Sequence, residues 1–195
     1  KAAGDSRNDP FGSARFAAFS ALVTLAKADK RLAPKALEAL FKAACDEHKD
    51  VRTAAYHALG KLAQAEKSLA PKVLALLLKA AGDSSEYVRS AAAYALGELV
   101  KAEKSLAPKA LAPLIKAVGD ADKYVCKAAA SVLGEIAQAD KSLAPKALER
   151  LLKAMRDYRG DESVHARSAA FSVMGLLTQA DKSLAPKALD VLLKA

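Results

Sequence analysis

The sequence has no tryptophan, only 5% aromatic residues and only two cysteines among its 195 residues. Two cysteines cannot build a disulfide framework, so we expect a reducing environment inside the cell, most simply the cytoplasm. No apolar run reaches the roughly 18 residues that a membrane-spanning helix needs, so a membrane is not an expected partner. Apolar residues still make up 52% of the chain, too many for a disordered protein. Alanine and leucine therefore have to build most of the core.

Proline is also scarce, but five of the seven prolines recur in a regular pattern. Each of these five follows Leu-Ala and precedes Lys, and the intervals between them are 37, 37, 37 and 41 residues. A period in this range is typical of a solenoid, in which similar units stack on one another. The last interval is longer because of four inserted residues, Tyr158–Asp161, and Ser6–Asp9 repeats this insertion near the start. The period divides the chain into five units, about 1–41, 42–78, 79–115, 116–152 and 153–195.

Each unit contains two apolar patterns with helical spacing, and none shows the alternation of a β-strand. The first helix begins at the Leu-Ala-Pro-Lys string and the second is rich in alanine; we call them the proline helix and the alanine helix. In one proline helix we expect Ser68 to cap the start, Pro71 to lie in the first turn and Gly82 to end the helix in a left-handed conformation. The expected core faces are, in this helix, Leu69, Val73, Leu74, Leu77 and Leu78 and, in the next alanine helix, Val88, Ala92, Ala95, Leu96 and Leu99.

A polar pattern recurs at the start of the alanine helices. In the second unit Asp46 precedes Val51-Arg52, alanines and a Leu-Gly pair, and the third unit repeats this pattern from Asp83. Together with the period, the pattern resembles HEAT repeats, especially the short HEAT-like repeats of bacterial proteins. The resemblance implies an all-α fold, a right-handed α–α superhelix of five two-helix repeats, in which Asp and Arg form a ladder of hydrogen bonds that Cys126 interrupts. Carried onto this chain, the ladder consists of Asp9, Arg15, Asp46, Arg52, Asp83, Arg89, Asp161 and Arg167.

The same resemblance implies a function. HEAT-like solenoids are mostly protein-binding scaffolds whose concave surface is built from the second helix of each repeat, so we expect a protein or peptide partner. A minority of them bind nucleic acid, so the fold alone does not decide the function. The candidate binding residues on the exposed stripe of the alanine helices are Thr53, His57, Lys61, Gln64, Ser90, Tyr94, Glu98, Lys101, Lys127, Ser131, Glu135, Gln138, Ser168 and Ser172.

Little in the sequence points to catalysis. His48, His57 and His165 do not form the short spacings with one another or with cysteine that zinc sites use. Cys45 and Cys126 have no oriented base at a recognisable spacing, and no glycine-rich phosphate loop is present. We therefore expect no enzymatic activity, no metal and no cofactor.

The net charge of +9 makes nucleic-acid binding the main alternative function. The lysines largely repeat from unit to unit, which indicates a solvated scaffold surface, and Glu98 and Glu135 interrupt the candidate stripe. The close similarity of the units also leaves open an engineered or consensus-derived scaffold. Because the outermost units lack a distinct polar cap, we expect the chain to be part of a longer array. Its apolar ends predict end-to-end self-association at high concentration.

Overall fold

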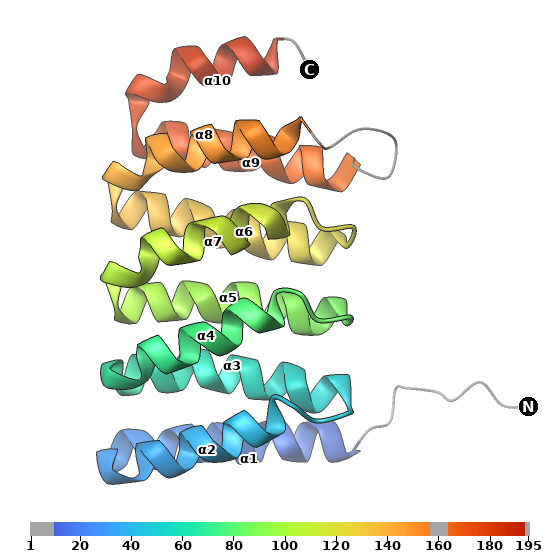
Figure 1. The fold of residues 1–195 in the computed structure, drawn as a ribbon, viewed down its shortest axis with the longest axis vertical. Coiled ribbons are helices and arrows are strands. Elements are labelled where there is room, and N and C mark those ends of the chain that lie inside the picture. The colour runs from blue at the N-terminus through green and yellow to red at the C-terminus, as the bar shows by residue number, and fades with distance from the viewer. Residues whose placement is uncertain (1–9, 157–163, 194–195) are drawn as a thin grey trace, which may run out of the picture.

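Alanine helices and proline helices form two layers that run along a stack of antiparallel helix pairs (Figure 1). The computed structural model describes residues 10–156 and 164–193, and no strand occurs within these ranges. The alanine helices are α1 (Pro10–Ala28), α3 (Lys49–Ala65), α5 (Glu86–Ala102), α7 (Lys123–Ala139) and α9 (Val164–Ala180). The proline helices are α2 (Ala33–Ala43), α4 (Ala70–Ala80), α6 (Ala107–Val118), α8 (Ala144–Met155) and α10 (Ala185–Leu192). The all-helical solenoid of five helix pairs expected from the sequence is confirmed.

A short 3-10 turn precedes each proline helix. These turns are η1 (Lys30–Leu32), η2 (Lys67–Leu69), η3 (Lys104–Leu106), η4 (Lys141–Leu143) and η6 (Lys182–Leu184). In η2 the carboxylate of Glu66 accepts hydrogen bonds from the backbone N–H and the hydroxyl of Ser68, at 3.3 and 2.8 Å. The prediction that Ser68 caps the helix is therefore wrong, because the preceding acidic residue caps the turn and Ser68 lies inside it. Pro71 lies in the first turn of α4, as predicted.

Two further expectations about α4 are also wrong. The helix ends at Ala80, and Gly82 follows in a turn whose backbone is not left-handed, with the Gly82 N–H donating to the carbonyl of Lys79 at 3.1 Å. Leu78 is exposed rather than buried. Its position lies about 100° around the helix from the buried Leu77, away from the centre of the buried stripe. The other predicted core residues of α4 and α5 are buried, as expected.

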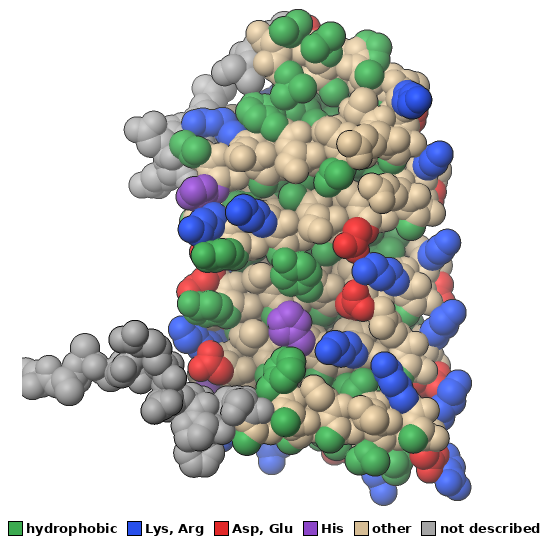
Figure 2. All heavy atoms as spheres, turned by 180° about the vertical axis from the view of Figure 1, so that it is seen from behind, with side chains coloured by type: hydrophobic (Ala, Val, Ile, Leu, Met, Phe, Trp, Pro, Cys, Tyr) green, Lys and Arg blue, Asp and Glu red, His purple; other side chains and the backbone are tan. Residues whose placement is uncertain are grey.

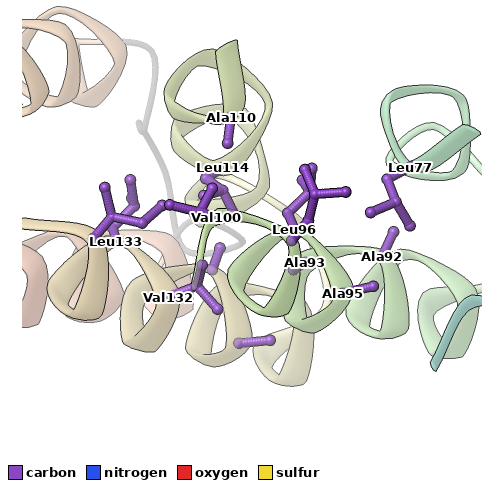
Figure 3. Close-up of a cluster of buried hydrophobic side chains, with 14 of the residues drawn as sticks. Leu77, Ala92, Ala93, Ala95, Leu96, Val100, Ala110, Leu114, Val132 and Leu133 are labelled. Atoms are coloured by element: carbon purple, nitrogen blue, oxygen red, sulfur yellow. The ribbon is translucent and has the colours of Figure 1, made fainter. Parts of the chain in front are cut away.

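Small side chains allow the alanine helices to approach one another closely. Successive alanine helices contact each other along their length, whereas successive proline helices contact each other much less. Ala55, Ala92 and Ala129, which occupy the same position in three successive units, are fully buried. Figure 3 shows this packing around α5, where Ala92 and Ala95 face the neighbouring helices and leucines from the proline layer complete the core. The core is therefore a thin aliphatic layer to which every unit contributes the same kind of side chains.

Glycines in the alanine helices allow a test of this close approach. A Cβ atom on Gly60 would lie 3.0 Å from both Cα and Cβ of Ala95, while a Cβ on Gly175 would meet no atom within 4 Å. Because glycine weakens a helix interior by about 0.5–1 kcal/mol relative to alanine, Gly175→Ala is expected to raise the free energy of unfolding by about that amount. Gly60→Ala is expected to lower the free energy of unfolding, since the backbone of Ala95 cannot move aside. Urea unfolding followed by circular dichroism measures both changes.

Gly134→Ala gives an intermediate case. The atom nearest to its added Cβ would be Cδ1 of Leu176, at 2.5 Å, the far end of a side chain that can rotate, while Cβ and Cγ of Leu176 would lie at 3.1 and 3.2 Å. We expect its stability to fall between those of the other two variants. Equal stabilisation by all three substitutions would show that helix approach does not require glycine.

Candidate functional site

The exposed side of the alanine helices forms one surface along the stack, which we call the alanine face (Figure 2). Every candidate binding residue on α3, α5, α7 and α9 is exposed or half-buried on this face. These residues share a side because positions three and four apart lie above one another on a helix, opposite the buried stripe. In Figure 2, hydrophobic and histidine side chains gather in the middle of the face, and acidic and basic side chains lie beside them.

Polar side chains connect three successive alanine helices across the alanine face. Gln64 on α3 donates a hydrogen bond to Glu98 on α5. The Lys101 Nζ atom lies 3.1 Å from Oε1 of Glu98 and 3.0 Å from Oε2 of Glu135 on α7. Hydrogen bonds to Glu135 and then to Glu98 raise the pKa of Lys101. One ammonium thus stands between two carboxylates, so this part of the face has no surplus of positive charge.

An aromatic region lies next to this network. The rings of His57 and Tyr94 stack with their centroids 6.5 Å apart and their planes 28° apart. Phe16 on α1 is exposed nearby, where a groove of about 170 Å³ between α1 and α3 is lined by Phe16, His57, Lys27 and Lys61 among others. Burial lowers the pKa of His57, and the charge of Lys61 lowers it further. The His57 ring is therefore neutral at pH 7 and offers an aromatic surface with hydrogen-bonding capacity.

A second groove contains two tyrosines, Tyr87 and Tyr124, that the sequence analysis did not predict as binding residues. It has a volume of about 210 Å³, and its lining includes Tyr87, Tyr94 and Tyr124. The Nζ of Lys49 lies 4.5 Å from the ring centroid of Tyr87, and that of Lys123 lies 4.9 Å from the ring centroid of Tyr124. A signal for this pair was present, because Tyr87 and Tyr124 occupy the same position in successive units, directly before the valine of the ladder pattern. Their exposed aromatic faces add contact area to the alanine face.

The groove between α7 and α9 has a different chemistry. It has a volume of about 360 Å³ and is lined by Lys123, Lys127, Ala130, Ser131, His165, Ser168, Ala169, Ser172 and Leu176. None of these lining residues is acidic, in contrast to the region around Lys101. The alanine face therefore changes along the stack, from aromatic near α3 to basic and hydroxyl-rich near α9.

Two rungs of the Asp–Arg ladder link successive units in the described residues. Arg52 donates from Nε and Nη2 to the two carboxylate oxygens of Asp83, at 3.0 and 2.8 Å, and Arg89 donates in the same way to Asp120, at 2.7 and 2.8 Å. The Nη1 atom of Arg52 also donates to the backbone carbonyl of Asp46, at 3.0 Å, in its own unit. Each arginine thus joins the loop before its own helix to the loop of the following unit. Asp120 belongs to the ladder although the sequence reasoning did not include it.

The remaining ladder candidates differ in their surroundings. The side chain of Asp46 accepts a hydrogen bond from the backbone N–H of His48, at 2.9 Å. Within the described ranges Arg15 is exposed and forms no ion pair with Asp46. Arg167 is half-buried, and Asp9 and Asp161 lie outside the described residues. Two complete rungs are therefore visible in the part of the chain that the structure describes.

Burial affects the ionisation of two groups in the ladder. Burial alone would raise the pKa of Asp83, but the hydrogen bonds from Arg52 and from the backbone N–H of Ser85 outweigh it and hold this pKa below its ordinary value. Cys126 occupies the arginine position of the fourth unit, and its buried thiol donates to the carbonyl of Asp120, at 2.9 Å. Burial, together with nearby carboxylates, raises the pKa of Cys126 to about 11. The thiol is therefore protonated at pH 7 and a weak nucleophile.

Metal clusters and membrane-spanning helices are absent from the described residues. No cluster of three or more His, Cys, Asp or Glu side chains in that part of the chain could hold a metal ion. None of the helices in the described ranges is both long and apolar enough to cross a membrane. Cys45 and Cys126 are both free. Because they contain the residues predicted from the sequence, the grooves of the alanine face are taken as the candidate sites.

The stacked antiparallel helix pairs and the Asp–Arg ladder define the class of α-solenoid repeat proteins. The family model for HEAT repeats matches residues 6–97 and 74–163, and the chain therefore belongs to the HEAT-repeat family. The resemblance seen in the sequence is thus confirmed. No curated protein matches the chain.

Several known structures share this fold. The designed armadillo repeat protein YIII(Dq)4CqI is 22% identical, with a TM-score of 0.54 over 96% of this chain and 89% of that chain. The designed armadillo repeat protein YIII(Dq.V1)4CPAF in complex with peptide (KR)4 is 23% identical, with a TM-score of 0.56 over 95% and 87%. A homology model of the full-length AP-3 complex is 18% identical, with a TM-score of 0.65 over 92% of this chain and 29% of that chain. At these identities the likeness concerns the fold alone.

Proposed function

We propose that this chain is a non-catalytic scaffold that binds an extended peptide or protein segment along the alanine face. The observation that carries the proposal is the row of grooves between successive alanine helices, next to the exposed side chains of Phe16 and Tyr94. Aromatic side chains are enriched at protein interfaces because they supply large contact area with few rotatable bonds. Membership of the HEAT-repeat family supports a binding role, as does the (KR)4 peptide named with one of the similar armadillo proteins.

The unequal packing of the two layers supports the choice of this face. In a stack of helix pairs, the layer whose helices approach more closely follows the shorter path and lies on the inner side of the curve. The alanine helices are that layer, because they contact each other far more than the proline helices do. A concave surface surrounds an extended segment with more contacts than a convex surface does. The alanine face is accordingly the expected concave surface.

The polarity of the face indicates the kind of segment that fits. An apolar or aromatic side chain matches the region around His57 and Tyr94. An acidic side chain matches the α7–α9 groove, where Lys123 and Lys127 lie in a depression whose described lining residues include no carboxylate. Beside these regions, toward the carboxyl ends of α5 and α7, the network around Lys101 presents hydrogen-bonding groups with balanced charge. The expected partner segment thus carries an apolar anchor followed or preceded by acidic residues.

Nucleic acid is a weaker candidate for the same face. A phosphate backbone that follows the helices would have to pass Glu98 and Glu135, whose carboxylates already hold Lys101. Nucleic-acid binding would also collapse as salt rises, because it depends on the release of counterions. Retention of labelled DNA or RNA at low salt and its loss at moderate salt would favour this alternative.

Peptide selection followed by substitution tests the proposal. Peptides from a displayed random library are selected on the immobilised chain, and one selected peptide is titrated against wild type and Tyr94→Ala. A central aromatic anchor contributes about 2 kcal/mol or more, so Tyr94→Ala is expected to weaken binding at least ~10-fold. Isothermal titration calorimetry measures the change.

Leu78→Ala is the matched control. Leu78 is 42% exposed and Tyr94 is 46% exposed, but Leu78 belongs to the proline layer. We expect Leu78→Ala to leave the affinity unchanged. Weaker binding by Leu78→Ala, with Tyr94→Ala at wild-type affinity, would place the site on the other layer and contradict the proposal. Circular dichroism checks that both variants remain helical.

A further inference from the structure

We propose that the two ends of this stack are complementary and that a second copy of the chain docks onto them head to tail, which continues the solenoid. The proposal rests on positions whose side chains are buried inside the stack and exposed at its ends. It is independent of any partner on the alanine face.

The first end is formed by α1. Leu25 on α1 is 54% exposed. Its counterparts one and two units later, Leu62 and Leu99, are both 0% exposed. The same residue type at the same position is thus covered wherever a preceding unit is present. The uncovered surface of α1 is the side that each later alanine helix presents to the unit before it.

The second end is formed by α10. Leu189 and Leu192 on this helix are 57% and 44% exposed. Their counterparts on α8, Leu148 and Leu151, are 1% and 0% exposed because another helix pair follows α8. This end therefore exposes the side that each earlier proline helix presents to the unit after it.

The glycine position at which alanine helices approach each other closely inside the stack is uncovered at this end. Inside the stack, a Cβ added to Gly60 would lie only 3.0 Å from the Cα of Ala95 on the next alanine helix. Gly175 holds the position of Gly60 on α9, and a Cβ added there would meet nothing within 4 Å. Ala21 holds the position of Ala95 on α1 and is exposed. Head-to-tail docking would place Ala21 of one copy against Gly175 of the other.

These observations indicate a second copy as the occupant. Each end exposes one half of a junction that the chain itself forms between successive units, so the shape and the apolar side chains of the two halves already match. Both halves are present on one molecule at opposite ends, which makes the contact heterologous. A heterologous contact of this kind does not close on itself, so chains can add without a fixed limit. The expected assemblies are linear oligomers.

Sedimentation velocity and light scattering from micromolar to millimolar concentration test the proposal. The wild-type mass is expected to rise above the monomer value of 20.4 kDa with concentration and to continue past the dimer. Leu25→Glu and Leu189→Glu are each expected to weaken self-association at least ~10-fold, since burial of one leucine contributes about 1.5–3 kcal/mol. A strictly monomeric wild type at millimolar concentration would overturn the proposal.

Mixing the two variants identifies the geometry. Leu25→Glu leaves the α10 end intact, and Leu189→Glu leaves the α1 end intact, so an equimolar mixture is expected to form dimers with one copy of each and no longer species. If one variant still dimerised alone, the contact would join two identical ends, and the head-to-tail arrangement would be wrong. Leu78→Glu, at an exposed leucine on the side of the stack, is the control and is expected to associate like wild type. Circular dichroism verifies that all three variants are folded.

Discussion

Leu96→Ala is expected to lower the free energy of unfolding by about 2–5 kcal/mol, as large-to-small substitutions in a tightly packed core do. Leu96 lies on α5 in the central unit and is 1% exposed. Figure 3 shows it within a cluster that also contains Leu77 of α4 and Leu114 of α6. Each unit of a solenoid contacts only its neighbours, so a cavity in the central unit is expected to weaken the junctions on both sides as well as the unit itself. Urea unfolding followed by circular dichroism measures the change.

Leu78→Ala is the control for this substitution because it removes the same atoms from a largely exposed site on α4. We expect its effect to stay within about 0.5 kcal/mol, as is usual for surface positions. If Leu96→Ala and Leu78→Ala lowered the free energy of unfolding equally, burial in the structure would not determine which leucines stabilise the stack. A separate unfolding transition in Leu96→Ala would show that the cavity uncouples the two halves of the solenoid.

Asp83→Ala is expected to destabilise the protein by about 2–4 kcal/mol, between the small contribution of exposed ion pairs and the larger loss on breaking buried ones. The substitution removes both hydrogen bonds that the Arg52 guanidinium donates to the Asp83 carboxylate and leaves that half-buried guanidinium without its carboxylate partner. It also removes the hydrogen bond from the backbone N–H of Ser85, at 2.9 Å. Urea is the denaturant of choice because guanidinium would screen the ion pair.

Asp46→Ala is the matched control for the ladder. Asp46 occupies the same position one unit earlier and accepts the corresponding backbone hydrogen bond from His48, but within the described residues no arginine of the preceding unit pairs with it. Asp46→Ala is expected to lower the free energy of unfolding by about 1 kcal/mol, as the removal of a helix cap does. Equal effects of the two substitutions would show that the Arg52–Asp83 contact contributes nothing to stability.

The difference between wild type and Asp83→Ala is also expected to depend on pH. The pKa of Asp83 in the folded protein lies below its ordinary value, so the carboxylate stabilises the fold at pH values above its ordinary pKa near 4. As the pH falls through the folded-state pKa, the carboxylate becomes protonated and this contribution is lost. The stability difference should therefore be constant near pH 7 and shrink below about pH 4. A difference that grew on acidification would contradict the assigned role.

Most of the helical framework could be predicted from local patterns. The core positions of α5 were read correctly because a helix places residues three and four apart on one side, whatever the helix packs against. The errors lie at helix ends and at Leu78, which helical spacing assigned to the core of α4 and which is exposed. Before α4, Glu66 and Ser68 both have side chains suited to capping, and it is the Glu66 carboxylate that accepts from the N–H of Ser68. After α4, the Gly82 N–H donates to the carbonyl of Lys79 without a left-handed backbone.

The candidate site was predictable only in part. The exposed stripe with Tyr94 and Lys101 followed from helical spacing, but the spacing could not tell that Lys101 lies between two carboxylates from different units. Tyr87 and Tyr124 were missed although they lie three residues before Ser90 and Lys127 and so continue the same stripe by one turn toward the start of each helix. The grooves themselves depend on the distance between helices that are about 37 residues apart in the chain.

The sequence by itself determined the period of the repeat, the two helices of each unit and the side of each helix that is buried, because these depend on local spacing and on the position of proline. Only the tertiary structure decided what one unit does to the next. Arg52 donates to Asp83 of the next unit, and Gly60 leaves room for the close packing of Ala95. The counterparts of Leu25 and Leu189 are buried only where another unit packs against them. Each of these contacts joins residues from different units, and its geometry is set by how the units stack.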